Sequence, residues 1–189
     1  MNFFSKLNPF KTKATEIVDS QDLAELISGL GLSESGIEVT PKNAMQLSTV
    51  YACIRVLAES VGMLPLNLLL VSGDKRERAK KHAAQKLFTT GPNDYMTALE
   101  YKELIITQLC LRGNHYAFIN WVGNKPMELL PLSPENVTPK LNDDWSVEYK
   151  VTFPNGTWDY IPAENILHIR LQTHDGLTGM SPIQQGRHA

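Results

Sequence analysis

The sequence contains little cysteine: Cys53 and Cys110 are the only two in 189 residues. Two cysteines are too few for a disulfide framework in a chain this long, and both fall within helical apolar patterns. We therefore expect buried free thiols and a reducing compartment. No stretch approaches the roughly 20 consecutive apolar residues that a membrane-spanning helix needs. The formal net charge is −2, which excludes a general attraction to DNA or acidic membranes and leaves only local contacts.

Catalytic and phosphate-binding motifs are absent as well. The chain has no G-x-S-x-G, no G-x-x-x-x-G-K-[ST], no G-x-G-x-x-G and no H-x-x-x-H pair. A small metal hydrolase would use His168, His174 and Asp175, but zinc sites need three or four converging ligands. His168 also lies in a strand pattern between Leu167 and Ile169, which favours a side chain on a sheet face. We therefore expect no catalytic residue, no metal and no cofactor.

Two helices are signalled at both of their ends. The first has Ser48 as its expected N-cap, then a broad apolar stripe, and Gly62 as its stop. The second begins at Thr97, which has the capping-box spacing with Glu100, and it ends at Gly113. Because the local signals agree along these segments, we interpret them as scaffold.

The chain after the second helix changes from helical to alternating periodicity, which predicts short antiparallel strands in a small barrel or a curved sheet. These strands are His115–Val122, Met127–Leu132, Trp145–Phe153, Thr157–Ile161 and Ile166–Leu171. Earlier in the chain, Leu66–Val71 is apolar on both faces and predicts one buried strand. The Gly-rich segment Asp175–Gly179 predicts a tight strand-to-helix turn more strongly than an anion cradle.

These patterns predict an α+β fold in three parts. Residues 1–40 are expected to form a flexible N-terminal arm and tether. Residues 41–180 form the α+β region, which is helical over 41–112 and β-rich over 113–180. A Ser-Pro pair then begins a helix within 181–189. A helix this short is not stable alone, so we expect the chain to be the leading part of a longer protein.

A basic cluster lies between the two helices, in a loop predicted over Asp74–Lys81. Charge runs usually do no more than solvate a surface turn. Clustered lysine and arginine also displace counterions from DNA phosphates, however. The candidate nucleic-acid contacts are Lys75, Arg76, Arg78, Lys80 and Lys81. A short helix is expected directly after them, around 82–88.

Aromatic residues in the strands leave a second function open. A binding module for single-stranded nucleic acid would stack bases on such rings. The candidates are Tyr116, Phe118, Trp121, Tyr149, Phe153, Trp158 and Tyr160. Aromatic residues with strand periodicity more often form the core, and the weak basic balance also argues against this module.

An ordered series of short motifs resembles the portal proteins of tailed bacteriophages. The series opens with Ser48–Ile54, Ala58–Val61, Leu64–Leu66, Pro92-Asn93 and Met96-Thr97. It continues with Leu111–Ala117, Glu128–Leu132, Pro134–Val137, Ile166–Arg170 and Asp175–Pro182. Each motif is short, and their shared order carries the resemblance. It covers most of the chain and corresponds to the N-terminal, wing-side part of the family, before the stem helix.

The resemblance implies a non-enzymatic ring subunit at one vertex of a phage or prophage capsid. Such rings, usually dodecameric, serve procapsid assembly, the packaging and ejection of double-stranded DNA, and head–tail joining. The implied partners are other copies of the chain, the terminase large subunit, the major capsid and scaffolding proteins, the head–tail adaptor and double-stranded DNA, with no membrane. The implied location is the portal vertex of the procapsid and virion, and the bacterial host cytoplasm before assembly.

Overall fold

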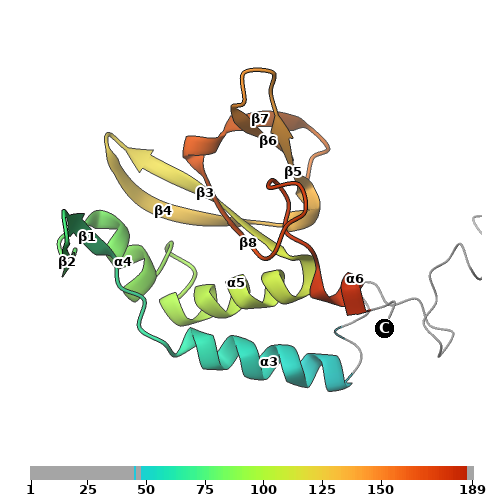
Figure 1. Cartoon of the computed structure of the whole chain (residues 1–189), viewed down its shortest axis with the longest axis horizontal. Coiled ribbons are helices and arrows are strands. Elements are labelled where there is room, and N and C mark those ends of the chain that lie inside the picture. The colour runs from blue at the N-terminus through green and yellow to red at the C-terminus, as the bar shows by residue number, and fades with distance from the viewer. Residues whose placement is uncertain (1–44, 46–47, 187–189) are drawn as a thin grey trace, which may run out of the picture. The chain divides into compact units, whose positions relative to one another are not determined.

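The computed structural model describes Met45 and residues 48–186 of the chain (Figure 1). Its helices are α3 (Ser48–Gly62), α4 (Ala83–Thr89), α5 (Ala98–Arg112) and α6 (Pro182–Gly186). Its strands are β1 (Leu69–Ser72), β2 (Lys75–Arg78), β3 (Asn114–Val122), β4 (Lys125–Leu132), β5 (Val137–Leu141), β6 (Val147–Thr152), β7 (Trp158–Pro162) and β8 (Ile166–Arg170). The predicted arm over 1–40 lies outside the described residues.

Helix α5 has the ends that the sequence predicts. The backbone N–H of Thr97 donates to the carboxylate of Glu100 over 2.8 Å, and the N–H of Glu100 donates to the Thr97 hydroxyl over 3.3 Å. This capping box satisfies two backbone donors that the first turn leaves unpaired. Gly113 ends the helix at φ 75°, in the left-handed region. Ser48 is the first residue of α3 rather than its N-cap, which shifts that prediction by one position.

The strands form two separate three-stranded antiparallel sheets and one hairpin. The strand orders are β4-β3-β8, β5-β6-β7 and β1-β2. The fold is therefore α+β as predicted, with curved open sheets and no closed barrel in the described part of the chain. Pro126, Pro131 and Pro139 remove backbone donors from the edge strands β4 and β5, which disfavours further pairing along these edges.

Strand β3 connects two hydrophobic cores because its successive side chains point to opposite faces. Ala117 packs with Tyr101, Ile105 and Leu109 of α5 in the first core. Tyr116, the preceding residue, packs in the second core; its buried neighbours there are Val137, Tyr149, Val151 and Ile166. In Figure 1, α5 lies under the sheet that contains β3, and α3 lies beneath α5.

Four further sequence expectations are wrong. The strand expected over Leu66–Val71 is β1, which is exposed along its whole length because it pairs only with β2. The loop expected over Asp74–Lys81 contains strand β2. The region 41–112, which was expected to be helical, therefore also contains the β1–β2 hairpin. Trp145 lies in the turn before β6 at φ 66° and not in the strand. Cys53, which was expected to be buried, is also exposed, whereas Cys110 is half-buried.

The two left-handed glycines Gly113 and Gly156 give a matched pair of stability predictions. A Cβ at Gly156, with φ 82°, would meet no atom within 4 Å. Gly156→Ala should therefore add only backbone strain and lower the free energy of unfolding by about 1 kcal/mol. A Cβ at Gly113 would collide with the carbonyl group of Met180, so Gly113→Ala should cost about 1 to 3 kcal/mol more. Urea titration measures both values, and equal losses would contradict the packing of 179–181 against this helix end.

Candidate functional site

A buried polar network lies where the two sheets meet the segment before α6. The side chain of Asn114 is its hub: Oδ1 accepts from the N–H of Gly179 over 2.7 Å, and Nδ2 donates to the Gly179 carbonyl over 2.8 Å. His168 Nε2 lies 3.1 Å from the same Asn114 oxygen, and His168 Nδ1 lies 3.2 Å from the hydroxyl of Tyr149. The partners fix one arrangement of protons, in which His168 donates from Nε2 to Asn114 and accepts at Nδ1 from Tyr149.

A second histidine, which is fully buried, joins α5 to β3. His115 Nδ1 lies 2.6 Å from Gln108 Oε1, and His115 Nε2 lies 3.1 Å from the hydroxyl of Tyr101. Because the Gln108 oxygen only accepts, His115 carries its proton on Nδ1 and accepts from Tyr101 at Nε2. Burial, and then the nearby His168, lower the pKa of His115 to about 4. Burial, and then Arg170, lower the pKa of His168 to about 4. Both rings are neutral at pH 7.

These contacts explain why His168, His174 and Asp175 do not form a metal site. Both ring nitrogens of His168 are engaged with protein groups, and the described residues contain no group of three or more potential metal ligands. The Asp175 carboxylate instead accepts from the backbone N–H groups of Leu177 and Thr178, each over 2.8 Å. These hydrogen bonds lower the pKa of Asp175 and point the backbone donors of this Gly-rich turn inward. The geometry supports the turn and gives no cradle for an external anion.

The five predicted basic residues lie in two neighbouring segments of the chain. Lys75, Arg76 and Arg78 belong to β2, whereas Lys80 and Lys81 lie in the connection that leads into α4. The root of the β1–β2 hairpin is held by Gln85 of α4, which accepts from the N–H of Leu68 over 2.6 Å and donates to the Leu66 carbonyl over 3.1 Å. None of the five basic side chains forms a hydrogen bond or ion pair with another described residue, so their charges face solvent.

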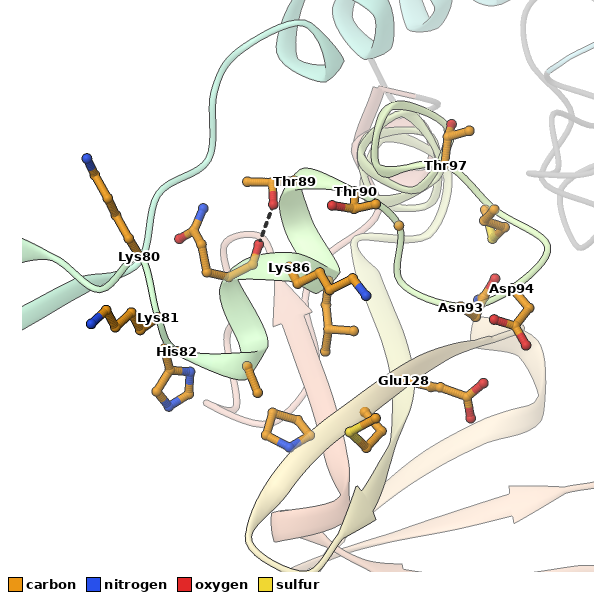
Figure 2. Close-up of a pocket in the computed structure, with 17 residues that line it drawn as sticks. Lys80, Lys81, His82, Lys86, Thr89, Thr90, Asn93, Asp94, Thr97 and Glu128 are labelled. Carbon is orange, nitrogen blue, oxygen red and sulfur yellow. Dashed lines mark hydrogen bonds between the residues drawn. The ribbon is translucent and has the colours of Figure 1, made fainter.

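A cleft of about 580 Å³ opens between α4 and β4, next to Lys80 and Lys81. Figure 2 shows that Lys86 extends toward the side of the cleft that carries Asp94 and Glu128, whereas Lys80 and Lys81 point away from these carboxylates. The cleft therefore has mixed charge, with lysines and carboxylates in its lining. The role in nucleic-acid binding predicted for the five basic residues remains a prediction.

The aromatic residues do not form the stacking platform that a single-strand binding module needs. Tyr116 and Tyr149 are buried in the second core, with Phe118 packed against it. Trp158 and Tyr160 are exposed, but Lys150 Nζ lies 4.6 Å from the Trp158 ring centroid and Lys140 Nζ lies 5.1 Å from that of Tyr160. Lysines of the same sheet thus contact the rings of Trp158 and Tyr160, whereas Trp121 and Phe153 are exposed on other elements.

A second hollow is apolar. This groove, also of about 580 Å³, lies between the end of α3, helix α5 and strand β8. Its lining includes Leu64, Leu66, Ile106 and Leu167, and Lys102 at its edge donates to the Leu64 carbonyl over 2.8 Å.

None of the helices that the structure describes is both long and apolar enough to cross a membrane.

Sequence analysis missed Asn114, the hub of the polar network at the start of β3. The sequence feature that could have indicated Asn114 is its position directly after the left-handed Gly113, where the chain passes from helix to strand. The partner at Gly179 lies 65 residues away, and no local pattern indicates such a contact.

The two neutral histidines predict a pH-dependent stability. Their folded pKa values of about 4 lie below the ordinary value of 6.5, so the unfolded chain binds more protons between these limits. Stability should therefore fall as the pH drops from about 6.5 toward 4, by about 1 to 2 kcal/mol per pH unit. Urea midpoints measured above pH 4.5, where carboxylates contribute less, isolate the effect.

The control for this prediction compares a half-buried, hydrogen-bonded histidine with an exposed one. His168→Gln should reduce the pH slope to about half, because only the His115 ring then remains to be protonated against a lowered pKa. The exposed His174→Gln should keep the slope of the parent chain. Identical slopes in all three proteins would contradict the assignment of neutral, hydrogen-bonded rings.

Comparison with known proteins identifies related chains. A family model described as "Phage portal protein" matches residues 48–189. The chain is 44% identical over 135 residues to protein BeeE of Escherichia coli (strain K12), a match that covers 70% of this chain and 83% of BeeE. It is 32% identical over 151 residues to the portal protein of Enterobacteria phage HK97, covering 77% of this chain and 34% of that protein.

Solved structures share the fold. A chain in the neck of an empty GTA particle with C6 symmetry has a TM-score of 0.62 at 22% identity, covering 86% of this chain and 45% of that chain. An HK97 family phage portal protein from Corynebacterium diphtheriae has a TM-score of 0.51 at 11% identity, covering 78% and 44%. The chain thus spans about a third of the HK97 portal protein and under half of these solved chains. From the match over residues 48–189, we conclude that this chain belongs to the phage portal protein family.

Proposed function

We propose that this chain is a structural subunit that assembles with copies of itself at the portal vertex of a phage or prophage particle. The observation that carries the proposal is the family match over residues 48–189, together with a fold shared with a chain of a particle neck. The geometry fits an architectural role, because His115 and His168 are held inside the fold by hydrogen bonds to Tyr101 and Tyr149.

The finer parts of the role follow from the family. In this proposal the ring is dodecameric, and residues 41–180 form its wing side. The ring nucleates procapsid assembly in the host cytoplasm, contacts the major capsid or scaffolding protein, docks the terminase large subunit and passes double-stranded DNA. It later joins the head–tail adaptor, and the chain has no enzymatic activity of its own.

Native mass spectrometry of the purified chain tests the self-assembly that this function requires. We expect a concentration-dependent series of masses above the 21.2 kDa monomer, ending in one closed ring. A heterologous contact repeated by rotation closes in this way. A strictly monomeric chain at every concentration would contradict the proposed function for this protein.

We also propose that Lys80 and Lys81, whose ammonium groups have no described carboxylate partner, contact DNA phosphates. Replacing both with Ser should weaken the binding of duplex DNA and lower the slope of log affinity against log salt by up to about one per lost contact. Filter binding over a series of salt concentrations measures the slope. Lys125→Ser, at the first residue of β4, is the matched control. An unchanged slope in the Lys80/Lys81 variant would contradict the contact.

A further inference from the structure

The β1–β2 hairpin has two chemically different faces. Its register pairs Leu69 with Arg78 and Val71 with Arg76, and directly paired side chains share a face of an antiparallel ribbon. One face therefore combines two aliphatic side chains with two arginines, and we call it the aliphatic–arginine face. Leu69 is 52% exposed and Val71 is 63% exposed. A two-stranded hairpin is only marginally stable without a covering partner.

This combination fits a protein surface better than a nucleic acid. The phosphate backbone of a duplex would engage Arg76 and Arg78, but it offers no apolar surface for Leu69 and Val71. A partner that carries both carboxylates and exposed apolar side chains would satisfy all four. Neither arginine has an ion-pair partner among the described residues, so an incoming carboxylate would not have to displace one.

The same chain carries such a complementary surface at the turn between β5 and β6. Asp143, Asp144 and Trp145 follow one another there, and Trp145 is 82% exposed. Leu141, at the end of β5, is 41% exposed. We call Leu141, Asp143, Asp144 and Trp145 the acidic tryptophan turn.

The acidic tryptophan turn is held in one shape by its own hydrogen bonds. The N–H of Trp145 donates to the Asn142 carbonyl over 3.0 Å, and the N–H of Asn142 donates to the Ser146 carbonyl over 2.9 Å. Ser146 donates its N–H and its hydroxyl to Asp144 Oδ1 over 2.9 and 2.6 Å. Binding would therefore cost little ordering of the loop. Tryptophan and arginine are also the residues that most often dominate the energy of protein interfaces.

We propose that the aliphatic–arginine face of one subunit docks on the acidic tryptophan turn of a second copy of this chain. The two surfaces match in kind, with two apolar side chains and two like charges on each, of opposite sign between them. They lie apart in Figure 1, where the hairpin is beside α4 and the β5–β6–β7 sheet is on the far side of β3 and β8. One subunit therefore offers both surfaces at once, which gives a head-to-tail contact. This inference rests on the proposed self-assembly and names the surfaces that perform it.

Charge reversal with rescue tests the contact. R76E/R78E and D143R/D144R should each weaken self-association at least tenfold in sedimentation velocity, because each juxtaposes like charges at the interface. The four-fold variant that carries both reversals should recover most of the parental association. Trp145→Ala should weaken association by a similar factor without changing its salt dependence.

The matched control is Lys75→Glu, which alters the charge on the opposite face of the same hairpin and should leave association unchanged. Circular dichroism confirms that each variant is folded. If the parent chain associates but neither reversal weakens it, the proposed function stands and these surfaces are not the contact. If R76E/R78E loses duplex DNA binding and keeps self-association, the face serves nucleic acid and the inference is overturned. If no protein in the series associates, the proposed function fails with it.

Discussion

The alternation of side chains along β3 is the constraint on which the rest of the structure depends. Ala117 closes the core under α5, and Tyr116, one residue earlier, belongs to the core shared with the second sheet. The register that pairs Tyr116 with His168 also brings Asn114 opposite Arg170. A slip of one residue would move every one of these side chains to the wrong face and break both cores together. The polar network at the start of β3 pins that register, because Asn114 bonds both His168 and Gly179.

Much of the fold could be predicted from the sequence wherever the signals are local. The capping box at Thr97 and the left-handed stop at Gly113 fixed helix α5 to within a residue. Alternation located β3, β4, β6, β7 and β8, but strand β5 (Val137–Leu141) was missed. The wrong predictions concern whether an element is covered by other parts of the chain and where it ends. An apolar segment such as Leu69–Ser72 has the same pattern whether a second layer covers it or not. Trp145 continues an alternating pattern, but the hydrogen bonds of the turn from Asn142 to Ser146 take it out of the strand.

The candidate surfaces, like the fold, could be predicted from the sequence only in part. The basic cluster is visible in the sequence, but only the hairpin register shows that Arg76 and Arg78 share a face with aliphatic residues while Lys80 and Lys81 do not. The inert character of the histidines also required the structure, since the partners of His115 and His168 come from other elements. Among the described residues, the two inward-facing histidines are held by hydrogen bonds, and unpaired charges and apolar side chains face outward. This distribution fits a part that assembles with other proteins.

The most direct test of this account is a cryo-electron microscopy map of the particle that the purified chain forms. The account predicts a closed ring in which the β1–β2 hairpin of each subunit contacts the turn between β5 and β6 of the next. A ring whose hairpins face solvent or DNA, with Trp145 away from every neighbour, would contradict it.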